Sequence, residues 1–230
     1  MKWFLIIFAL VSVVNIASIA FKREWLRCIS KVLIIPSLLA AFIAGGGIGL
    51  IKSGSFASGS LFVILAMVFG WIGDILLIKK SKRTIFKLGI LSFLIGHLCY
   101  IVTFLALLGF FSIYQGMVNF PAFVIYAPVL IIGGIFVYGL IKPFKEMKPI
   151  VIMYMVIIMS MSLWGFEVFF FYPGLAGALI FLGSLLFLIS DTLLAYYAFR
   201  KIKMFPEIMI MVSYIMAQTE IILGLLLLNA

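Results

Sequence analysis

The sequence carries very little charge. Only 10% of its 230 residues are Asp, Glu, Lys or Arg, whereas 67% are hydrophobic. A soluble domain of this size cannot hide so much apolar surface from water. The composition therefore excludes a soluble globular protein and indicates a polytopic membrane protein whose main solvent is lipid.

Alternation of apolar and polar residues is also missing. The apolar runs are nearly continuous over about 20 residues, whereas the strands of a membrane barrel are about half as long and alternate. In lipid the backbone must satisfy its own hydrogen bonds, so only helices and closed barrels can cross a membrane. We therefore expect an all-α membrane protein.

Metal ligands and disulfide partners are scarce. The chain has two cysteines, Cys28 and Cys99, which we expect to be free thiols. Its one histidine, His97, excludes H-x-x-x-H ligand spacing. We therefore expect no metal and no cofactor, although one His with two Asp leaves a facial triad as an alternative.

Eight hydrophobic segments follow one another along the chain, and prolines lie at or near many of their ends. The connections are short, which predicts a single bundle of eight transmembrane helices forming one domain over residues 1–230. The first segment is followed at once by Lys22 and Arg23, which favours an uncleaved helix over a signal peptide. The expected spans are 3–21, 30–50, 59–78, 86–109, 118–141, 149–171, 174–199 and 206–228.

The formal net charge of +10 would suggest a nucleic-acid partner in a soluble protein. Here all but two of the 17 Lys and Arg residues flank alternate loops, the exceptions being Lys2 and Lys52. By the positive-inside rule these loops are cytoplasmic and both termini lie outside. We expect a multi-pass protein of a bacterial inner membrane, in contact with lipid and not with nucleic acid.

Two aspartates interrupt apolar helices. "FGWIGDILLI" at 69–78 contains Asp74, and "FLISDTLLAY" at 187–196 contains Asp191. A carboxylate inside a membrane helix costs about 3 kcal/mol, so the default interpretation is functional. For Asp74 the alternative is an interfacial carboxylate that pairs with Lys79 or Lys80, one turn away.

Two carboxylates in an apolar site need not titrate alike. One can stay protonated as a general acid while the other is an ionised general base. This arrangement suits a hydrolysis and suits proton-coupled transport equally well. Glu167 and Glu220 lie toward the far ends of their helices.

Further polar residues accompany the aspartates on three of the expected helices. His97 and Tyr100 are three residues apart, and Tyr214 and Gln218 are four apart, so each pair shares a helix face. Ser190 precedes Asp191 and lacks the G-x-S-x-G setting of a nucleophile. Each of these residues either orients a substrate or forms hydrogen bonds between helices.

Four motifs in this order resemble the lysoplasmalogenase family, the YhhN-like membrane proteins. They are G-D with following leucines at 73–77, F-x-x-G-H-x-x-Y at 93–100, S-D-x-x-L-A-Y at 190–196 and Y-x-x-x-Q at 214–218. The resemblance spans nearly the whole chain. It implies a membrane hydrolase that cleaves the vinyl-ether bond of lysoplasmalogens to a fatty aldehyde and glycerophosphocholine or glycerophosphoethanolamine.

The resemblance also implies roles for individual residues, with a lysophospholipid as substrate. Two are expected to be catalytic, Asp74 and Asp191. The expected substrate-binding residues are His97, Tyr100, Ser190, Tyr214 and Gln218.

Other classes of protein place two aspartates on different membrane helices. An intramembrane aspartyl protease needs G-x-G-D, but residues 71–74 read Trp-Ile-Gly-Asp and lack the first glycine. A proton-coupled transporter is the stronger rival and would show polar groups reaching both membrane faces. A purely structural or lipid-binding protein would not need two costly carboxylates.

Overall fold

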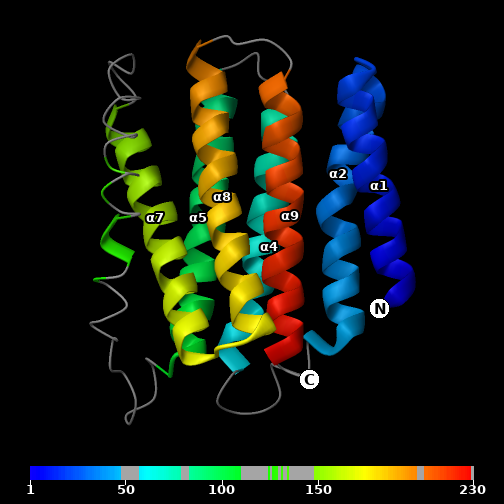
Figure 1. The fold of residues 1–230 in the computed structure, drawn as a ribbon. Helices are drawn as coiled ribbons and strands as arrows, with labels where there is room; N and C mark the ends of the chain where they lie inside the picture. The colour runs from blue at the N-terminus through cyan, green and yellow to red at the C-terminus, as the bar shows by residue number, and fades with distance from the viewer. Residues whose placement is uncertain are drawn as a thin grey trace. The chain divides into compact units, whose positions relative to one another are not determined.

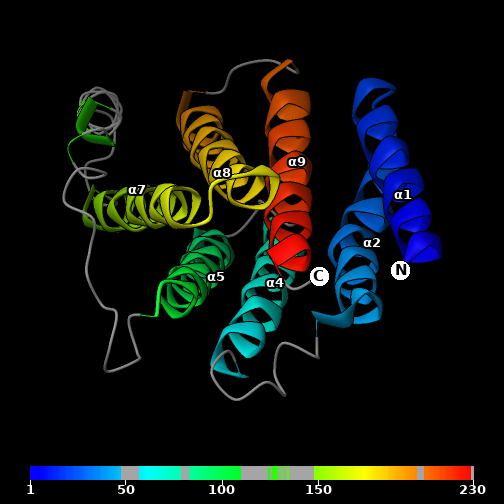
Figure 2. The same ribbon diagram turned by 60° about the horizontal axis from the view of Figure 1, so that its bottom comes forward.

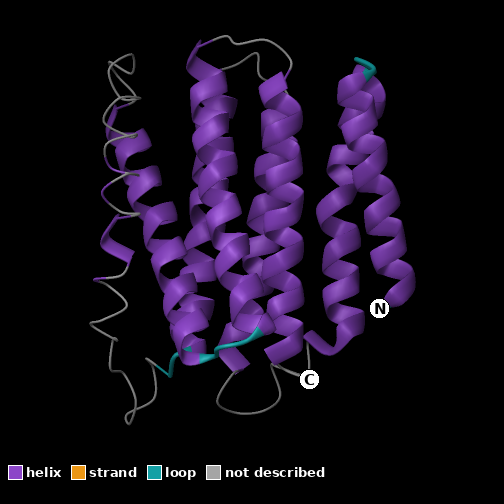
Figure 3. Cartoon of the chain, viewed as in Figure 1, coloured by secondary structure: helices purple, strands orange, loops and turns teal. Residues whose placement is uncertain are grey.

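The computed structural model describes residues 1–47, 57–78, 83–109, 124, 126–128, 131, 134, 148–200 and 205–228. Within these ranges the chain is helical apart from short turns and contains no strand (Figure 3). This agrees with the expected all-α class, since a backbone in lipid can satisfy its own hydrogen bonds by forming helices.

Seven of the described helices are long and apolar enough to cross a membrane. Their 19 to 26 residues give lengths of about 28–39 Å, enough for a hydrocarbon core of about 30 Å. The expected span at 118–141 lies largely outside the described residues. The count of eight spans therefore stays a prediction, as does the single domain.

The described chain divides into two compact units, which are treated separately below: Met1–Thr103 and Phe104–Leu228. The first unit contains α1 (Lys2–Ala20), α2 (Glu24–Phe42), a short π-helical segment η1 (Ile43–Gly47), α4 (Ala57–Ile78) and most of α5 (Arg83–Leu107). The second contains α7 (Lys148–Phe171), α8 (Leu175–Arg200) and α9 (Phe205–Leu228).

In the first unit α1 and α2 lie side by side and antiparallel (Figures 1 and 2). The turn between them is tight because the N–H of Arg23 donates to the carbonyl of Ser18 at 2.8 Å, with Lys22 in the left-handed region at φ 54°. α2 begins at Glu24, six residues before the expected span at 30–50. Consequently Cys28 belongs to a helix rather than to a loop, and Lys31 lies about two turns into that helix instead of at its start.

In the second unit α7, α8 and α9 follow one another as antiparallel neighbours (Figure 1). A three-residue turn, Tyr172–Gly174, joins α7 to α8, with Pro173 in its middle and Gly174 at φ 138°. α8 and α9 approach closely at Gly183, which has no side chain. A Cβ added there would lie only 2.8 Å from the carbonyl oxygen of Ala217. These two interfaces determine which positions along the axes of α7, α8 and α9 lie beside one another.

Candidate active-site residues

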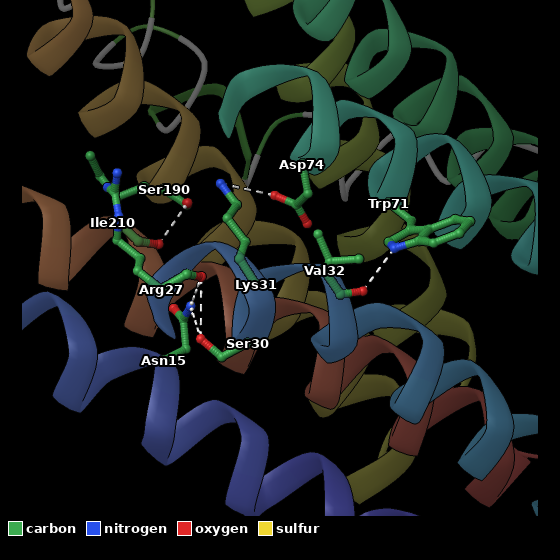
Figure 4. Close-up of polar contacts among 9 residues, drawn as sticks. All are labelled: Asn15, Arg27, Ser30, Lys31, Val32, Trp71, Asp74, Ser190 and Ile210. Atoms are coloured by element: carbon green, nitrogen blue, oxygen red, sulfur yellow. Dashed lines mark hydrogen bonds and ion pairs between the residues drawn. The ribbon is translucent and has the colours of Figure 1, made fainter. Parts of the chain in front are cut away.

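Asp74 lies near the end of α4 and is 2% exposed. Its Oδ1 is 3.2 Å from Nζ of Lys31, which comes from α2 (Figure 4). The sequence suggested Lys79 or Lys80 as a partner, and both lie outside the described residues. The cation placed against Asp74 thus comes from another helix, and sequence analysis had counted it only among the cations that set topology.

Pro36 and Trp71 fix the register of α2 against α4. Pro36 lies inside α2 and has no N–H, so the carbonyl of Val32 lacks its usual helical donor. The indole N–H of Trp71 donates to this carbonyl at 2.8 Å (Figure 4). Trp71 precedes Asp74 by three residues and Val32 follows Lys31, so this bond holds the two helices together beside the ion pair.

The other side of the same α2 segment is held by α1. Asn15 is fully buried, and its Nδ2 donates to the carbonyl of Arg27 at 3.1 Å and to Oγ of Ser30 at 2.9 Å (Figure 4). These two bonds satisfy the amide nitrogen and set the register of the helix pair, whereas Oδ1 of Asn15 has no hydrogen-bond partner among the described residues. The turn of α2 that carries Lys31 is therefore anchored to both neighbouring helices.

His97 and Tyr100 lie in α5 and are 2% and 1% exposed, as expected for residues facing the protein interior. A Cβ on Gly73 would meet the ring of Phe93, which sets the antiparallel register of α4 and α5. Asp74 is thus level with Phe93, and His97 lies one turn further along, about 6 Å in axial distance. His97 and Tyr100 therefore lie on the helix that packs against α4, but further along its axis than Asp74.

Asp191 lies on α8 and is 6% exposed. It accepts a hydrogen bond from the hydroxyl of Tyr154, a buried residue of α7. Sequence analysis missed Tyr154. The pairing could have been predicted from the hairpin that α7 and α8 form. Tyr154 and Asp191 lie almost equally far along the chain from Pro173 in the turn, and antiparallel helices place such positions side by side.

The side chain of Ser190 forms a hydrogen bond between two helices. Its Oγ donates to the carbonyl of Ile210 on α9 at 3.1 Å (Figure 4). This bond ties α8 to α9 at the level of Asp191, because the two residues are consecutive. Of the two interpretations that the sequence left open, the structure supports the interhelical hydrogen bond, and substrate contact by Ser190 stays a prediction.

Tyr214 and Gln218 are both buried in α9, at 4% and 1% exposure. The ring of Tyr214 packs edge-on against Phe187, with centroids 5.7 Å apart, one turn from Asp191. Gln218 follows Ala217, which faces Gly183. Gln218 therefore lies two turns from the level of Asp191, about 12 Å in axial distance. The structure brings Tyr214 near the level of this aspartate and leaves Gln218 well away from it.

A further polar cluster occupies the second unit. The hydroxyl of Tyr126 donates to Oγ of Ser162 at 2.5 Å, and Oγ of Ser184 lies 3.4 Å from the same atom. Glu167, also on α7, is 1% exposed. In the described part of the chain no three His, Cys, Asp or Glu side chains gather closely enough to hold a metal ion.

The comparisons with known proteins gave one match. A model of the YhhN family matches residues 26–225. This range includes all seven predicted site residues as well as Lys31 and Tyr154, and it begins after α1. No curated protein and no solved structure matches the chain.

Proposed function

Since the chain belongs to the YhhN family, we propose that it is an integral-membrane hydrolase that cleaves the vinyl-ether bond of lysoplasmalogens. The products are a fatty aldehyde and glycerophosphocholine or glycerophosphoethanolamine. The observation that carries the proposal is the burial of two carboxylates, Asp74 and Asp191, in membrane-length helices within the matched range. Each has a defined polar partner, Lys31 or Tyr154.

The chemistry requires one acid and one base. The acid gives a proton to the β-carbon of the alkenyl group, whose π electrons form the new C–H bond and leave an oxocarbenium ion. Water adds to the cationic carbon while the base takes a proton from it, giving a hemiacetal. We assign these two roles to Asp74 and Asp191, in the manner of the carboxylate pair of glycoside hydrolases.

Collapse of the hemiacetal closes the cycle. The bond between the former alkenyl carbon and the glycerol oxygen breaks, and the protonated base returns its proton to that oxygen. The hemiacetal hydroxyl gives its proton to the other carboxylate as the aldehyde C=O forms. Both aspartates return to their starting states, and one water is consumed.

The substrate fits a membrane site because it has a single alkenyl tail and a polar headgroup. We propose that the tail lies along lipid-facing helices while the headgroup stays at the cytoplasmic interface. In this arrangement both termini lie outside a bacterial inner membrane, as the distribution of Lys and Arg predicts. His97, Tyr100, Ser190, Tyr214 and Gln218 remain proposed substrate contacts.

Aldehyde release from the purified protein tests the proposal. The protein in detergent is given 1-alkenyl-glycerophosphoethanolamine or the choline analogue, and aldehyde is followed with a coupled dehydrogenase. We expect release by the wild type and loss of release in Asp74→Asn and in Asp191→Asn. Glu24→Gln, at an exposed carboxylate, is the matched control and should keep wild-type turnover. Absence of release from both substrates, or full turnover in both Asn variants, would refute the proposal.

One observation favours a second candidate, a proton-coupled transporter. Glu167 is buried in α7 toward the end of the helix away from Tyr154, so carboxylates lie at both ends of membrane-length helices. Proton flux into vesicles that contain the protein separates the two functions. A transporter acidifies the vesicle lumen when its substrate is added and releases no aldehyde.

A further inference from the structure

The α2 segment around Lys31 is built to present one cation to α4. Lys31 is 20% exposed at its side chain, whereas the Asp74 side chain that it meets is 3% exposed. Asn15 of α1 and Trp71 of α4 bond the backbone or side chains of residues on either side of it. The fold therefore fixes the backbone from which Lys31 extends toward Asp74.

An ammonium group in this position decides the charge of its partner. A carboxyl that is removed from water is normally driven toward its neutral form, and an opposite charge within 4 Å favours the ionised form. The separation of 3.2 Å meets this condition. Asp191 accepts a hydrogen bond from the hydroxyl of Tyr154.

We infer that Lys31 is a positioning residue that keeps Asp74 ionised, so that Asp74 is the base of the reaction. Because the proposed chemistry needs one acid and one base, Asp191 is then the acid. This inference rests on the proposed function. Asp191 gives its proton to the β-carbon, and the Asp74 carboxylate takes the proton of the attacking water. Asp74 then protonates the departing glycerol oxygen, and the hemiacetal hydroxyl proton restores Asp191.

A rival role for Lys31 makes a different kinetic prediction. As a ligand for the phosphate of the substrate, it would affect substrate binding, so its loss would raise KM and spare kcat. As the partner of the base, it affects proton transfer, so its loss lowers kcat and spares KM. Loss of a general base costs about 100-fold or more in turnover.

The experiment compares Lys31→Met, Lys31→Arg and the double variant Lys31→Met with Asp74→Asn. Infrared spectra report the C=O band of a protonated carboxyl, which is distinct from carboxylate bands. We expect this band to gain intensity in Lys31→Met and to lose that gain in the double variant, which identifies Asp74 as its source. The kcat for aldehyde release should fall about 100-fold in Lys31→Met and recover largely in Lys31→Arg. Lys87→Met, at an exposed cation of α5, is the matched control and should match the wild type in both readouts.

Each outcome bears on the inference. An unchanged C=O band in Lys31→Met, or a raised KM with wild-type kcat, would overturn it. If Lys31→Met does not fold but the double variant does, the unpaired carboxylate is the cause and the inference is supported. Failure of both to fold would make Lys31 merely structural. If the wild type releases no aldehyde, the proposed function fails, and the infrared comparison still tests the pairing of Lys31 with Asp74.

Discussion

Gly183 offers a quantitative test of the packing that positions Asp191. A Cβ added there would lie 2.8 Å from the carbonyl oxygen of Ala217 and 3.0 Å from the backbone nitrogen of Ile221. The first distance is about 0.6 Å short of the 3.4 Å at which ordinary contact begins. Both atoms belong to the backbone of α9 and cannot rotate away, so α8 and α9 must separate locally.

The magnitude follows from two opposing terms. Overpacking of this kind costs about 1–3 kcal/mol, and alanine gains about 0.5–1 kcal/mol over glycine in a helix. We therefore expect Gly183→Ala to lower the free energy of unfolding by about 1–2 kcal/mol, which is a fall of several degrees in the unfolding midpoint.

The assay is thermal unfolding of the purified protein in detergent. Gly134→Ala is the control, because a Cβ there would meet nothing within 4 Å, so its midpoint should stay equal or rise. A Gly183→Ala variant that unfolds at or above the wild-type temperature would refute the close packing of α8 on α9.

Two further predictions concern hydrogen bonds. Tyr154→Phe keeps the ring but removes the hydroxyl that donates to Asp191. Turnover in the aldehyde assay should therefore fall about 5- to 150-fold. Unchanged turnover would show that this hydrogen bond is dispensable. Ser190→Ala removes one donor to the carbonyl of Ile210, which also accepts from Ser213 at 3.2 Å, so the free energy of unfolding should change by about 1 kcal/mol or less. A large loss of stability in chemical unfolding of this variant would contradict the shared acceptor.

The helices themselves were predictable from hydrophobicity, because in lipid apolar composition and helix formation are linked. Most observed ends lie within three residues of the expected spans. The exception is α2, which begins at Glu24 and whose π-helical extension ends at Gly47, against an expected 30–50. Arg27 was placed in a loop and Lys31 at the very start of the expected span, because of their charge. The first turns of a membrane helix can nevertheless carry cations whose heads reach polar partners.

The partners of the two aspartates were harder to predict than the aspartates. The cost of a buried charge identified Asp74 and Asp191 from sequence alone, and both are buried. Lys31 and Tyr154 were missed because helix periodicity tells which residues share a face but not which levels of two helices meet. The same limitation applies to Gln218, which shares a face with Tyr214 but lies two turns from Asp191 along α9.

Pro36 has a consequence for engineering of this protein. Replacing a proline inside a helix normally improves that helix, because the missing N–H and the steric clash both disappear. Here the new N–H would compete with the Trp71 indole for the Val32 carbonyl. A consensus-style stabilisation of the single helix would therefore weaken its docking on α4, so local and tertiary order compete at this one carbonyl.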